Sequence, residues 1–501
     1  MSNKFYITTP IYYVNAAPHI GHSYTNIAAD ALARFMRRRL GDGSVWFLTG
    51  TDEHGQKIQK AADAQGLTAQ VFVDNTVAQF KNLWQKLDIS HNDFIRTTDP
   101  RHISTVQRVL DILYKKGDIY QAEYSGWYCT PCETFWVESQ LTDKICPDCK
   151  RPVEKITEIN YFFKLRQHQE WLIKYIEEHK DFICPEIRRN EVLSFLRMNE
   201  LTDLCISRPK ERLSWGITLP FSPGHVTYVW FDALINYISA VGEFDNAGVY
   251  HSKWWPADVH LMAKDILRQH AVYWPIILRA LNMELPKTLL VHGWWMIADT
   301  KMSKSLGNVV SPIDMAEKYG IDTYKYFLLR ELPFGLDGNF SESALVKRFN
   351  SDLANDLGNL VYRVLTMIEK YYQGNVPEAD SPKDRQAEAI NERLKNVSEE
   401  INKCLSWQND YNFSAALEKI WVLINSANKY IEETKPWNLV KENKIDELKC
   451  FIRFLTDVIR AVASELLPFL PQTAASILAQ IGKDTIAKGS PLFPRIDTKK
   501  T

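Results

Sequence analysis

The chain has 501 residues, of which 45% are hydrophobic and 24% charged, and its formal net charge is −1. These values are ordinary for a globular protein, and the length predicts three to four structural units. The near-zero charge excludes a generally cationic surface, although local Lys and Arg patches could still meet nucleic-acid phosphates. No apolar run approaches the roughly 20 residues that span a bilayer, so we expect no membrane association. Residues 1–4 precede the first predicted strand, which leaves no targeting peptide and predicts a cytoplasmic protein.

A strand, a turn and a helix are predicted at the start of the chain. Residues 5–9 are apolar and predict the strand, and apolar residues recur at helical spacing from Tyr24 to Leu40. His19, Gly21 and His22 lie in the turn between them. Gly21 lets the backbone approach a ligand, and a helix N-terminus offers N–H groups to phosphate. The two histidines could donate hydrogen bonds to phosphoryl oxygens.

The next predicted strand, residues 45–48, leads to three polar residues, Asp52, Glu53 and His54, and helices are predicted from there to about residue 115. This pattern is typical of half of a parallel α/β sheet. Such sheets place their chemistry at the carboxyl ends of the strands.

Four of the eight cysteines form two Cys-x-x-Cys pairs, Cys129 with Cys132 and Cys146 with Cys149. Two such turns can arrange four thiolates as a tetrahedron, which suits one Zn²⁺ ion. Disulfides are the alternative, and they are disfavoured in a cytoplasmic chain. Four sulfur ligands leave no open coordination position, so we predict a structural rather than a catalytic zinc.

The sheet is predicted to resume at residues 227–232, to continue through 259–262 and to close at 289–292. A lysine-rich loop follows at 301–305, and residues 350–485 are almost wholly amphipathic helix. We therefore divide the chain into six segments: a catalytic first half, 1–115; an insertion with the cysteine pairs, 116–222; a catalytic second half, 223–295; the lysine loop and a short α/β stretch, 296–349; a helical domain, 350–485; and a tail, 486–501.

Two short motifs, Pro18-His19-Ile20-Gly21-His22 and Lys301-Met302-Ser303-Lys304-Ser305, carry a family resemblance. Alone, the first is more often structural or metal-binding, and the second is usually a solvated loop. Together and in this order they match the two signatures of class I aminoacyl-tRNA synthetases, which the chain resembles over essentially its whole length. The resemblance implies a site that activates a carboxylate with ATP and Mg²⁺. Its ATP-binding and catalytic residues would be His19, Gly21, His22, His292, Lys301 and Lys304.

The absence of two features narrows the choice of amino acid that such a synthetase would activate. Synthetases for valine, isoleucine and leucine carry a much longer insertion, and the cysteine enzyme has a zinc ligand just ahead of the first motif, where this chain has no cysteine. The chain instead resembles methionyl-tRNA synthetases, with matches at residues 10–15, 228–233, 264–270 and 273–275. The implied fold is a Rossmann-like parallel-sheet domain, split by a zinc-binding insertion and followed by an all-α anticodon-binding domain.

This resemblance also implies a methionine site. A flexible thioether is recognised mainly by shape and by aromatic, polarizable surfaces. The implied methionine-binding residues are Ile11, Tyr13, Asp52, Trp230, Ala233, Tyr237, Asp265, His270 and Trp274. Tyr237 and His270 would lie nearest the sulfur. Two neighbouring positions, Gln269 and Ala263, differ from the Phe and Gly that the family commonly has.

The implied reaction makes methionyl-adenylate and pyrophosphate, and then transfers methionine to the terminal adenosine of tRNA, with Asp52 and Arg208 assisting the transfer. Asn359, Arg363 and Trp437 would read the CAU anticodon of tRNA(Met), because proteins read single-stranded loops by stacking and edge hydrogen bonds. Such a chain would serve both initiation and elongation. Because the chain ends soon after the helical domain, we expect a monomer.

Two other classes remain possible from sequence. A nucleotidyltransferase could share the first motif, but it would not need the helical domain. A tRNA-binding protein without activity would keep that domain and lose the motif histidines or lysines, all of which are present here.

Overall fold

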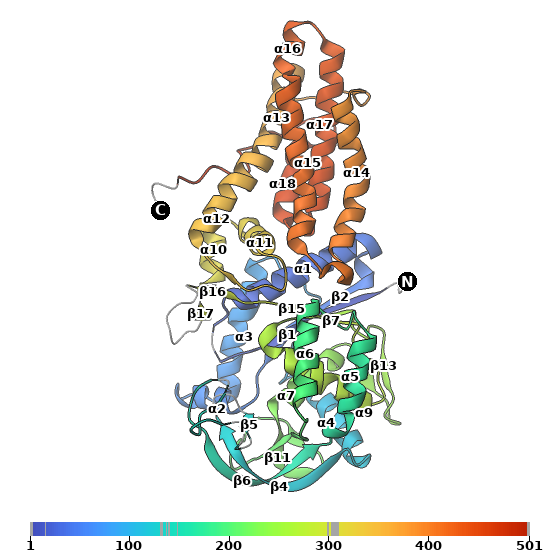
Figure 1. The fold of residues 1–501 in the computed structure, drawn as a ribbon. Helices are drawn as coiled ribbons and strands as arrows, with labels where there is room; N and C mark the ends of the chain where they lie inside the picture. Colours follow the sequence, from blue (N-terminus) through green and yellow to red (C-terminus); the bar gives the residue numbers. More distant parts are fainter. Residues whose placement is uncertain are drawn as a thin grey trace. The chain divides into compact units, whose positions relative to one another are not determined.

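The computed structural model describes residues 4–15, 17–130, 134–136, 138, 141–147, 149–297, 300–301 and 310–497. The chain forms two compact units (Figure 1): the first comprises residues 1–29 and 36–292, and the second comprises residues 30–35 and 293–501. Within the described part, no helix is long and apolar enough to cross a membrane.

A six-stranded sheet of parallel strands organises the first unit. Its order is β3-β2-β1-β14-β15-β7, and every neighbouring pair is parallel. The strands are β1 Phe5–Tyr13, β2 Val45–Asp52, β3 Asp93–Arg96, β7 Ile183–Cys184, β14 Val259–Ala263 and β15 Thr288–His292. The chain adds β2 and β3 on one side of β1 and β14 and β15 on the other, so the strand order reverses between β1 and β14. A crevice at the carboxyl ends is expected at such a switch point.

Helices surround this sheet (Figure 1). They are α1 Ile20–Leu40, α2 Gln56–Asp63, α3 Ala69–Lys86, α4 Pro100–Lys115, α5 Gln169–Glu178, α6 Glu186–Met198, α7 Val229–Leu234, α8 Asn236–Ser239 and α9 Trp274–Ala280. Their buried faces follow the helical period. In α3, for example, Phe72, Thr76 and Phe80 are buried at a spacing of four residues. Residues 30–35 of α1 belong to the second unit.

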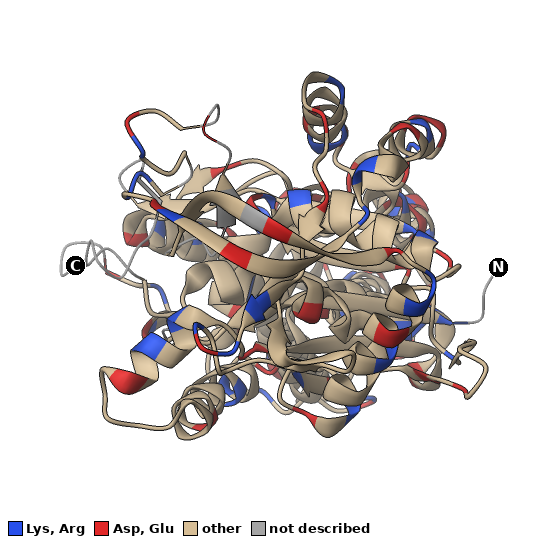
Figure 2. Cartoon of the chain, turned by 90° about the horizontal axis from the view of Figure 1, so that it is seen from below, with Lys and Arg blue, Asp and Glu red and all other residues tan. Residues whose placement is uncertain are grey.

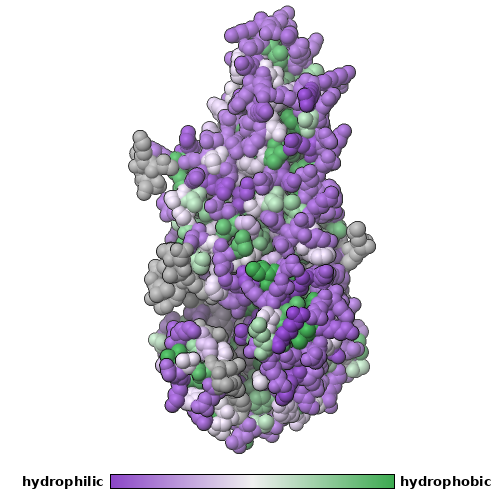
Figure 3. Space-filling view, viewed as in Figure 1, coloured by the Kyte–Doolittle hydropathy of each residue, from purple (hydrophilic) through white to green (hydrophobic). Residues whose placement is uncertain are grey.

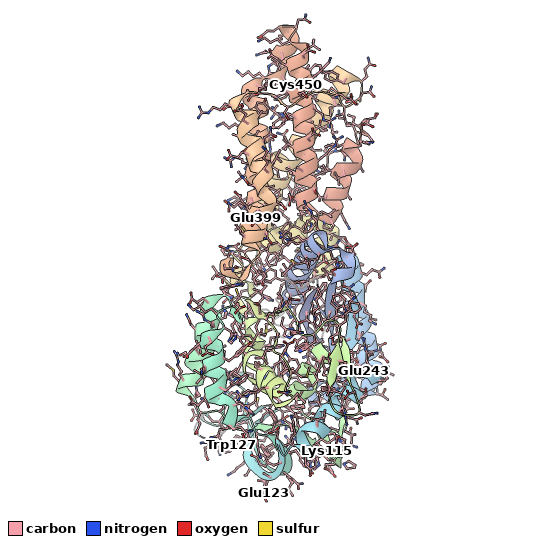
Figure 4. The ribbon with its side chains drawn as sticks, turned by 90° about the vertical axis from the view of Figure 1, so that its right-hand side faces the viewer. Lys115, Glu123, Trp127, Glu243, Glu399 and Cys450 are labelled. Atoms are coloured by element: carbon pink, nitrogen blue, oxygen red, sulfur yellow. The ribbon has the colours of Figure 1, made fainter. Side chains whose placement is uncertain are left out.

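A separate antiparallel sheet contains Cys129 at the end of one strand, and Cys146 and Cys149 lie between two others. Its order is β5-β4-β6-β8, with β4 Ile119–Cys129, β5 Thr134–Trp136, β6 Glu154–Phe163 and β8 Leu204–Cys205. Figure 4 labels Glu123 and Trp127 on β4. A three-stranded sheet in the order β10-β11-β9 follows, formed by β9 Ser207–Pro209, β10 Thr218–Leu219 and β11 Ser222–Thr227. The predicted insertion also supplies β7, the edge strand of the parallel sheet.

Two predicted local structures are wrong. Residues 227–232 were predicted as a returning strand of the parallel sheet. Instead Thr227 ends the antiparallel strand β11 and Val229 begins α7. Both ends of that six-residue helix are buried, and a short apolar run of that kind has no period that separates strand from helix. The first helix begins at Ile20 instead of Tyr24, which places Gly21 and His22 in its first turn.

The second unit is mainly helical. A small sheet formed by β16 Trp295–Ile297, β17 Thr300–Lys301 and β18 Gly338–Asn339 accompanies α10 Pro312–Tyr319, α11 Ile321–Arg330 and α12 Glu342–Arg348. A π-helix, Phe349–Gly358, leads into α13 Asn359–Tyr372. The remaining helices are α14 Arg385–Cys404, α15 Phe413–Thr434, α16 Pro436–Lys441, α17 Ile445–Leu466 and α18 Pro471–Ile481. Figure 1 shows α13, α14, α15 and α17 side by side as a bundle. The predicted helical region after the split sheet is confirmed.

The surface agrees with the near-zero net charge. Lys and Arg alternate with Asp and Glu over the view of Figure 2. Hydrophilic residues cover most of the face in Figure 3, and the hydrophobic residues there form small, separate patches. Figure 2 shows no large area of a single charge.

Candidate functional site

Two histidines cap the N-terminus of α1. His19 is the N-cap residue: its Nδ1 accepts a hydrogen bond from the backbone N–H of Gly21 (3.1 Å), and Nδ1 of His22 accepts one from the backbone N–H of His19 (3.1 Å). The rings stack with centroids 3.9 Å apart. An imidazole that accepts at Nδ1 carries its proton at Nε2, so each histidine presents an N–H donor beside the helix N-terminus.

The surroundings of His22 keep its ring neutral. Burial, with a smaller contribution from His19, lowers the pKa of His22 well below its ordinary value. Tyr12 packs edge-on against the His22 ring, with centroids 4.9 Å apart, and its hydroxyl accepts a hydrogen bond from Asn26 (2.6 Å). A Cβ on Gly21 would lie 3.0 Å from the His19 ring, so glycine gives that ring the space to cap the helix.

His292 ends β15 and reaches the same helix. Its Nε2 lies 2.8 Å from Oγ1 of Thr25, and its ring packs edge-on against Tyr24 (4.8 Å between centroids). The structure therefore brings His19, Gly21, His22 and His292 to the carboxyl ends of β1 and β15.

Four of the predicted methionine-site residues form one aromatic cluster. The Tyr237 hydroxyl lies 2.7 Å from Nε2 of His270, and Nδ1 of His270 lies 2.8 Å from the carbonyl oxygen of Ile266. Since a carbonyl only accepts, His270 carries its proton at Nδ1 and the tyrosine donates to Nε2. Trp274 lies 5.9 Å from Tyr237, and Trp230 lies 6.3 Å from His270, measured between centroids. Burial lowers the pKa of His270 to about 4.

The other predicted methionine residues lie around this cluster or at its strand ends. Ile11 packs against the same core, and Ala233 is buried in α7. Tyr13 and Asp52 pair directly at the ends of β1 and β2. Asp265 is exposed in the short turn before His270. Gln269 is half-buried, and among the described residues its Oε1 has no hydrogen-bond partner.

Arg208 is buried, so its charge does not lie on an exposed loop. Its guanidinium lies 5.3 Å from the ring of Tyr128 and 4.9 Å from that of Tyr228. Its Nη1 donates to the carbonyl oxygen of Ser207 (2.6 Å). Tyr228 is the N-cap residue of α7, and Tyr128 immediately precedes Cys129, so Arg208 joins the cysteine-bearing sheet to the helix of Trp230 and Ala233.

The sequence did not predict a buried network behind α7. Nδ1 of His54 lies 2.6 Å from one Asp232 oxygen, and Nε2 of His102 lies 2.7 Å from the other. His102 also contacts the hydroxyl of Ser239 in α8 at 2.8 Å. These residues come from four separate segments, and no spacing in the sequence pairs them.

Three of the four predicted metal ligands lie together. The ligand atoms of Cys129, Cys146 and Cys149 all lie within 4.8 Å of one another, and the sulfurs of Cys129 and Cys149 are 3.4 Å apart. Trp136 and Val153 pack around them as a small hydrophobic core. Three converging sulfurs could hold a metal ion of the kind that thiolates prefer. Cys132 lies outside the described residues.

The predicted anticodon residues belong to the helical unit. Asn359 is exposed at the start of α13, and Arg363, one turn later, lies 3.7 Å from Glu432 near the end of α15. Trp437, in α16, is 45% exposed. Figure 1 places α16 at one end of the bundle. The side chain of Lys301 and the whole of Lys304 lie outside the described residues.

Comparisons with known proteins decide the family. A model of class I tRNA synthetases, "tRNA synthetases class I (M)", matches residues 5–158 and 151–365, and the anticodon binding domain of methionyl tRNA ligase matches residues 376–491. The chain belongs to the methionine–tRNA ligase family. It is therefore a class I aminoacyl-tRNA synthetase, a ligase that joins methionine to tRNA, as the sequence predicted.

Relatives in this family match over nearly the whole chain. The methionine–tRNA ligase of Caldanaerobacter subterraneus subsp. tengcongensis is 49% identical, over 100% of this chain and 80% of the relative. That of Bacillus subtilis is 44% identical, over 100% and 79%. The methionyl-tRNA synthetase of Mycobacterium tuberculosis in complex with methionyl-adenylate has a TM-score of 0.91 and 39% identity, over 98% of this chain and 100% of that one. Its apo form has a TM-score of 0.85 and 35% identity, over 99% of each chain.

Proposed function

We propose that the chain activates L-methionine with ATP at the carboxyl ends of β1, β14 and β15. The methionine carboxylate attacks the α-phosphorus of ATP, which releases pyrophosphate and forms methionyl-adenylate. The observation that carries this assignment is the histidine cap of α1, in which both rings hold their proton at Nε2 beside a helix N-terminus. His19 and His22 would donate to phosphoryl oxygens as charge moves to the leaving group. Gly21 and His292 would line the same side of the proposed ATP site.

The lysine loop would supply further positive charge. We assign Lys301 and Lys304 to the pyrophosphate leaving group on the strength of the second class I motif alone, since neither side chain is described. ATP carries Mg²⁺, which would neutralise phosphate charge. No protein nucleophile is required, because the carboxylate of the substrate attacks.

The aromatic cluster would bind the methionine side chain. Trp230, Tyr237, His270 and Trp274 offer polarizable, largely buried surfaces, which suit a thioether. The residues at the strand ends, Ile11, Tyr13 and Asp52, would hold the α-ammonium group, with the Asp52 carboxylate as its counter-charge. Ala233 completes the wall from α7, and Asp265 lies at its rim.

Transfer and tRNA selection would use the remaining predicted residues. Asp52 and Arg208 would assist attack by the 3′-terminal adenosine. Asn359, Arg363 and Trp437 would read the CAU anticodon, because exposed aromatic and amide side chains recognise unstacked bases. The product would be methionyl-tRNA(Met) for both initiation and elongation, made by a cytoplasmic monomer. The chain would divide into the six segments 1–115, 116–222, 223–295, 296–349, 350–485 and 486–501.

One structural Zn²⁺ would complete the cysteine cluster, with Cys129, Cys132, Cys146 and Cys149 as thiolate ligands. The donor set fits, because three of these sulfurs already converge within a small apolar core. The ion would hold the two turns together and leave no coordination position for substrate.

One experiment tests the proposed function against its alternatives. Methionine-dependent exchange of pyrophosphate into ATP, followed by charging of tRNA with a CAU anticodon, should both be observed. A nucleotidyltransferase of another class would show no methionine dependence. An inactive tRNA-binding protein would bind tRNA and show no exchange.

A further inference from the structure

His260 lies behind the aromatic cluster and has no role in the proposed function. It belongs to β14, the strand at the switch point of the sheet, and its side chain is fully buried. Its ring stacks on Tyr237 with centroids 4.1 Å apart and an interplanar angle of 29°. Its Nε2 lies 3.2 Å from Nε1 of Trp274. One side chain therefore contacts two walls of the proposed methionine site.

The hydrogen bonds of His260 fix its protonation. An indole N–H only donates, so Nε2 of His260 accepts from Trp274 and the ring proton is on Nδ1. That nitrogen lies 2.7 Å from Oγ1 of Thr8 in the neighbouring strand β1, and the hydroxyl oxygen accepts its hydrogen bond. Burial, with a smaller contribution from His270, lowers the pKa of His260 well below its ordinary value, so the ring is neutral near pH 7.

His260 and His270 form two matching supports. Each is neutral and donates from Nδ1, to Thr8 or to the carbonyl oxygen of Ile266. Each accepts at Nε2, from the Trp274 indole or the Tyr237 hydroxyl. His270 lines the proposed site, whereas His260 reaches it only through Tyr237 and Trp274.

We infer that His260 is a positioning residue that sets the distance between Tyr237 and Trp274 and thereby the selectivity for methionine, an inference that rests on the proposed function. Sulfur is a weak hydrogen-bond acceptor, so a thioether site must discriminate largely by shape. The rings of Tyr237 and Trp274 are 5.9 Å apart and contact the same imidazole. Because this imidazole extends from a central strand and is bonded to the next one, it ties both walls to the sheet. Its loss should loosen the methionine site without touching the ATP site.

The test compares two substitutions in the full chain by methionine-dependent pyrophosphate exchange. His260→Leu removes both the stacking ring and the acceptor for Trp274. We expect the KM for methionine to rise about tenfold, with kcat and the KM for ATP within about twofold, which is the pattern of lost substrate binding. Selectivity against ethionine, which is one methylene longer, should fall. His260→Gln keeps an acceptor for the indole and should recover much of the loss.

Trp274→Phe supplies a second variant that keeps a ring at its position and removes the same hydrogen bond from the other side. It should raise the KM for methionine by itself, and the double variant should show a smaller rise than the product of the two single effects, because both changes remove the same hydrogen bond. If His260→Leu does not fold, His260→Phe takes its place, because phenylalanine keeps a stacking ring and removes the acceptor for Trp274, and it should also raise the KM for methionine selectively. Equal rises in the KM for methionine and for ATP, or an unchanged KM for methionine in the folded His260→Leu or His260→Phe protein, would overturn the inference. An unsubstituted chain without exchange would instead refute the proposed function.

Discussion

At the scale of single residues, burial lowers the pKa of three histidines of the first unit, His22, His260 and His270. The pKa of His270 is lowered to about 4, from an ordinary value of 6.5. Between about pH 6.5 and pH 4, His270 therefore binds a proton in the unfolded chain but not in the folded chain. The free energy of unfolding should fall as the pH drops from about 6.5 to about 4, at up to about 1.4 kcal/mol per pH unit for this group.

Equilibrium denaturation of the original chain and of His270→Gln checks this expectation. Most other groups contribute equally to both proteins, so the difference between their slopes reports mainly His270, with a smaller part from the coupled His260. The His270→Gln protein should lose less stability on acidification, by about 3 kcal/mol in total. Identical slopes would mean that folding does not lower the pKa of His270.

The residue types of the site could be predicted from sequence, but most of their contacts could not. The motif around His19 and His22, together with the lysine motif, predicts phosphate chemistry. The reciprocal capping of α1 by these two histidines depends on backbone geometry, which the motif does not show. His260 reads as one polar residue within an apolar strand, and nothing near it in sequence indicates Trp274. Long-range pairs of this kind are set by how the sheet orders its strands, which one sequence does not reveal.

At the scale of secondary structure, close strand pairing explains a glycine in β2. A Cβ on Gly50 would overlap the backbone carbonyl oxygen of Ile95 in β3, and backbone cannot rotate away. Gly50→Ala should therefore push β3 from β2 and lower the free energy of unfolding by roughly 1–3 kcal/mol. Gly43→Ala is the matched control, because no atom lies within 4 Å of the added Cβ, and it should change stability by less than about 0.5 kcal/mol. Equal stabilities in denaturation would contradict this account.

The cysteine cluster allows a second prediction at the scale of secondary structure. Cys146→Ala should release one equivalent of zinc, measured by elemental analysis, and should open the β4–β6 region to protease. Cys184→Ala changes a buried cysteine of β7 that lies outside the cluster, and it should keep the metal. Pyrophosphate exchange should partly survive the loss of zinc, since a structural ion touches no substrate. Folded, zinc-free protein with no exchange would make the metal catalytic.

The long amphipathic helices were predicted well from their spacing, whereas the short buried helix α7 was not. The amphipathic helices of residues 350–485 appear where their spacing indicates, because each buries one stripe against its neighbours. Residues 227–232 were predicted as strand, since their apolar and aromatic residues favour strands locally, whereas Val229 to Leu234 form α7. Burial at both of its ends removed the signal that would have shown a helix.

At the scale of the whole molecule, the proposed methionine site and the proposed anticodon residues belong to different units, and Trp437 tests whether their roles are separate. This tryptophan is 45% exposed in α16 of the second unit, whereas the aromatic cluster and the histidine cap belong to the first. Trp437→Ala should remove a stacking contact worth roughly 1–3 kcal/mol and lower kcat/KM for tRNA charging about ten- to a hundredfold. Pyrophosphate exchange needs no tRNA and should stay within about twofold of the original rate.

Trp407 offers the matched control, because it is 40% exposed in the same unit and lies outside the proposed anticodon residues. Trp407→Ala removes an equally exposed indole and should leave both charging and exchange nearly unchanged. If both substitutions reduced charging alike, the effect would come from loss of exposed aromatic surface in general. If Trp437→Ala lowered exchange as much as charging, this residue would support the fold, and the anticodon assignment would have to be withdrawn. A selective loss of charging in Trp437→Ala alone would tie tRNA reading to α16.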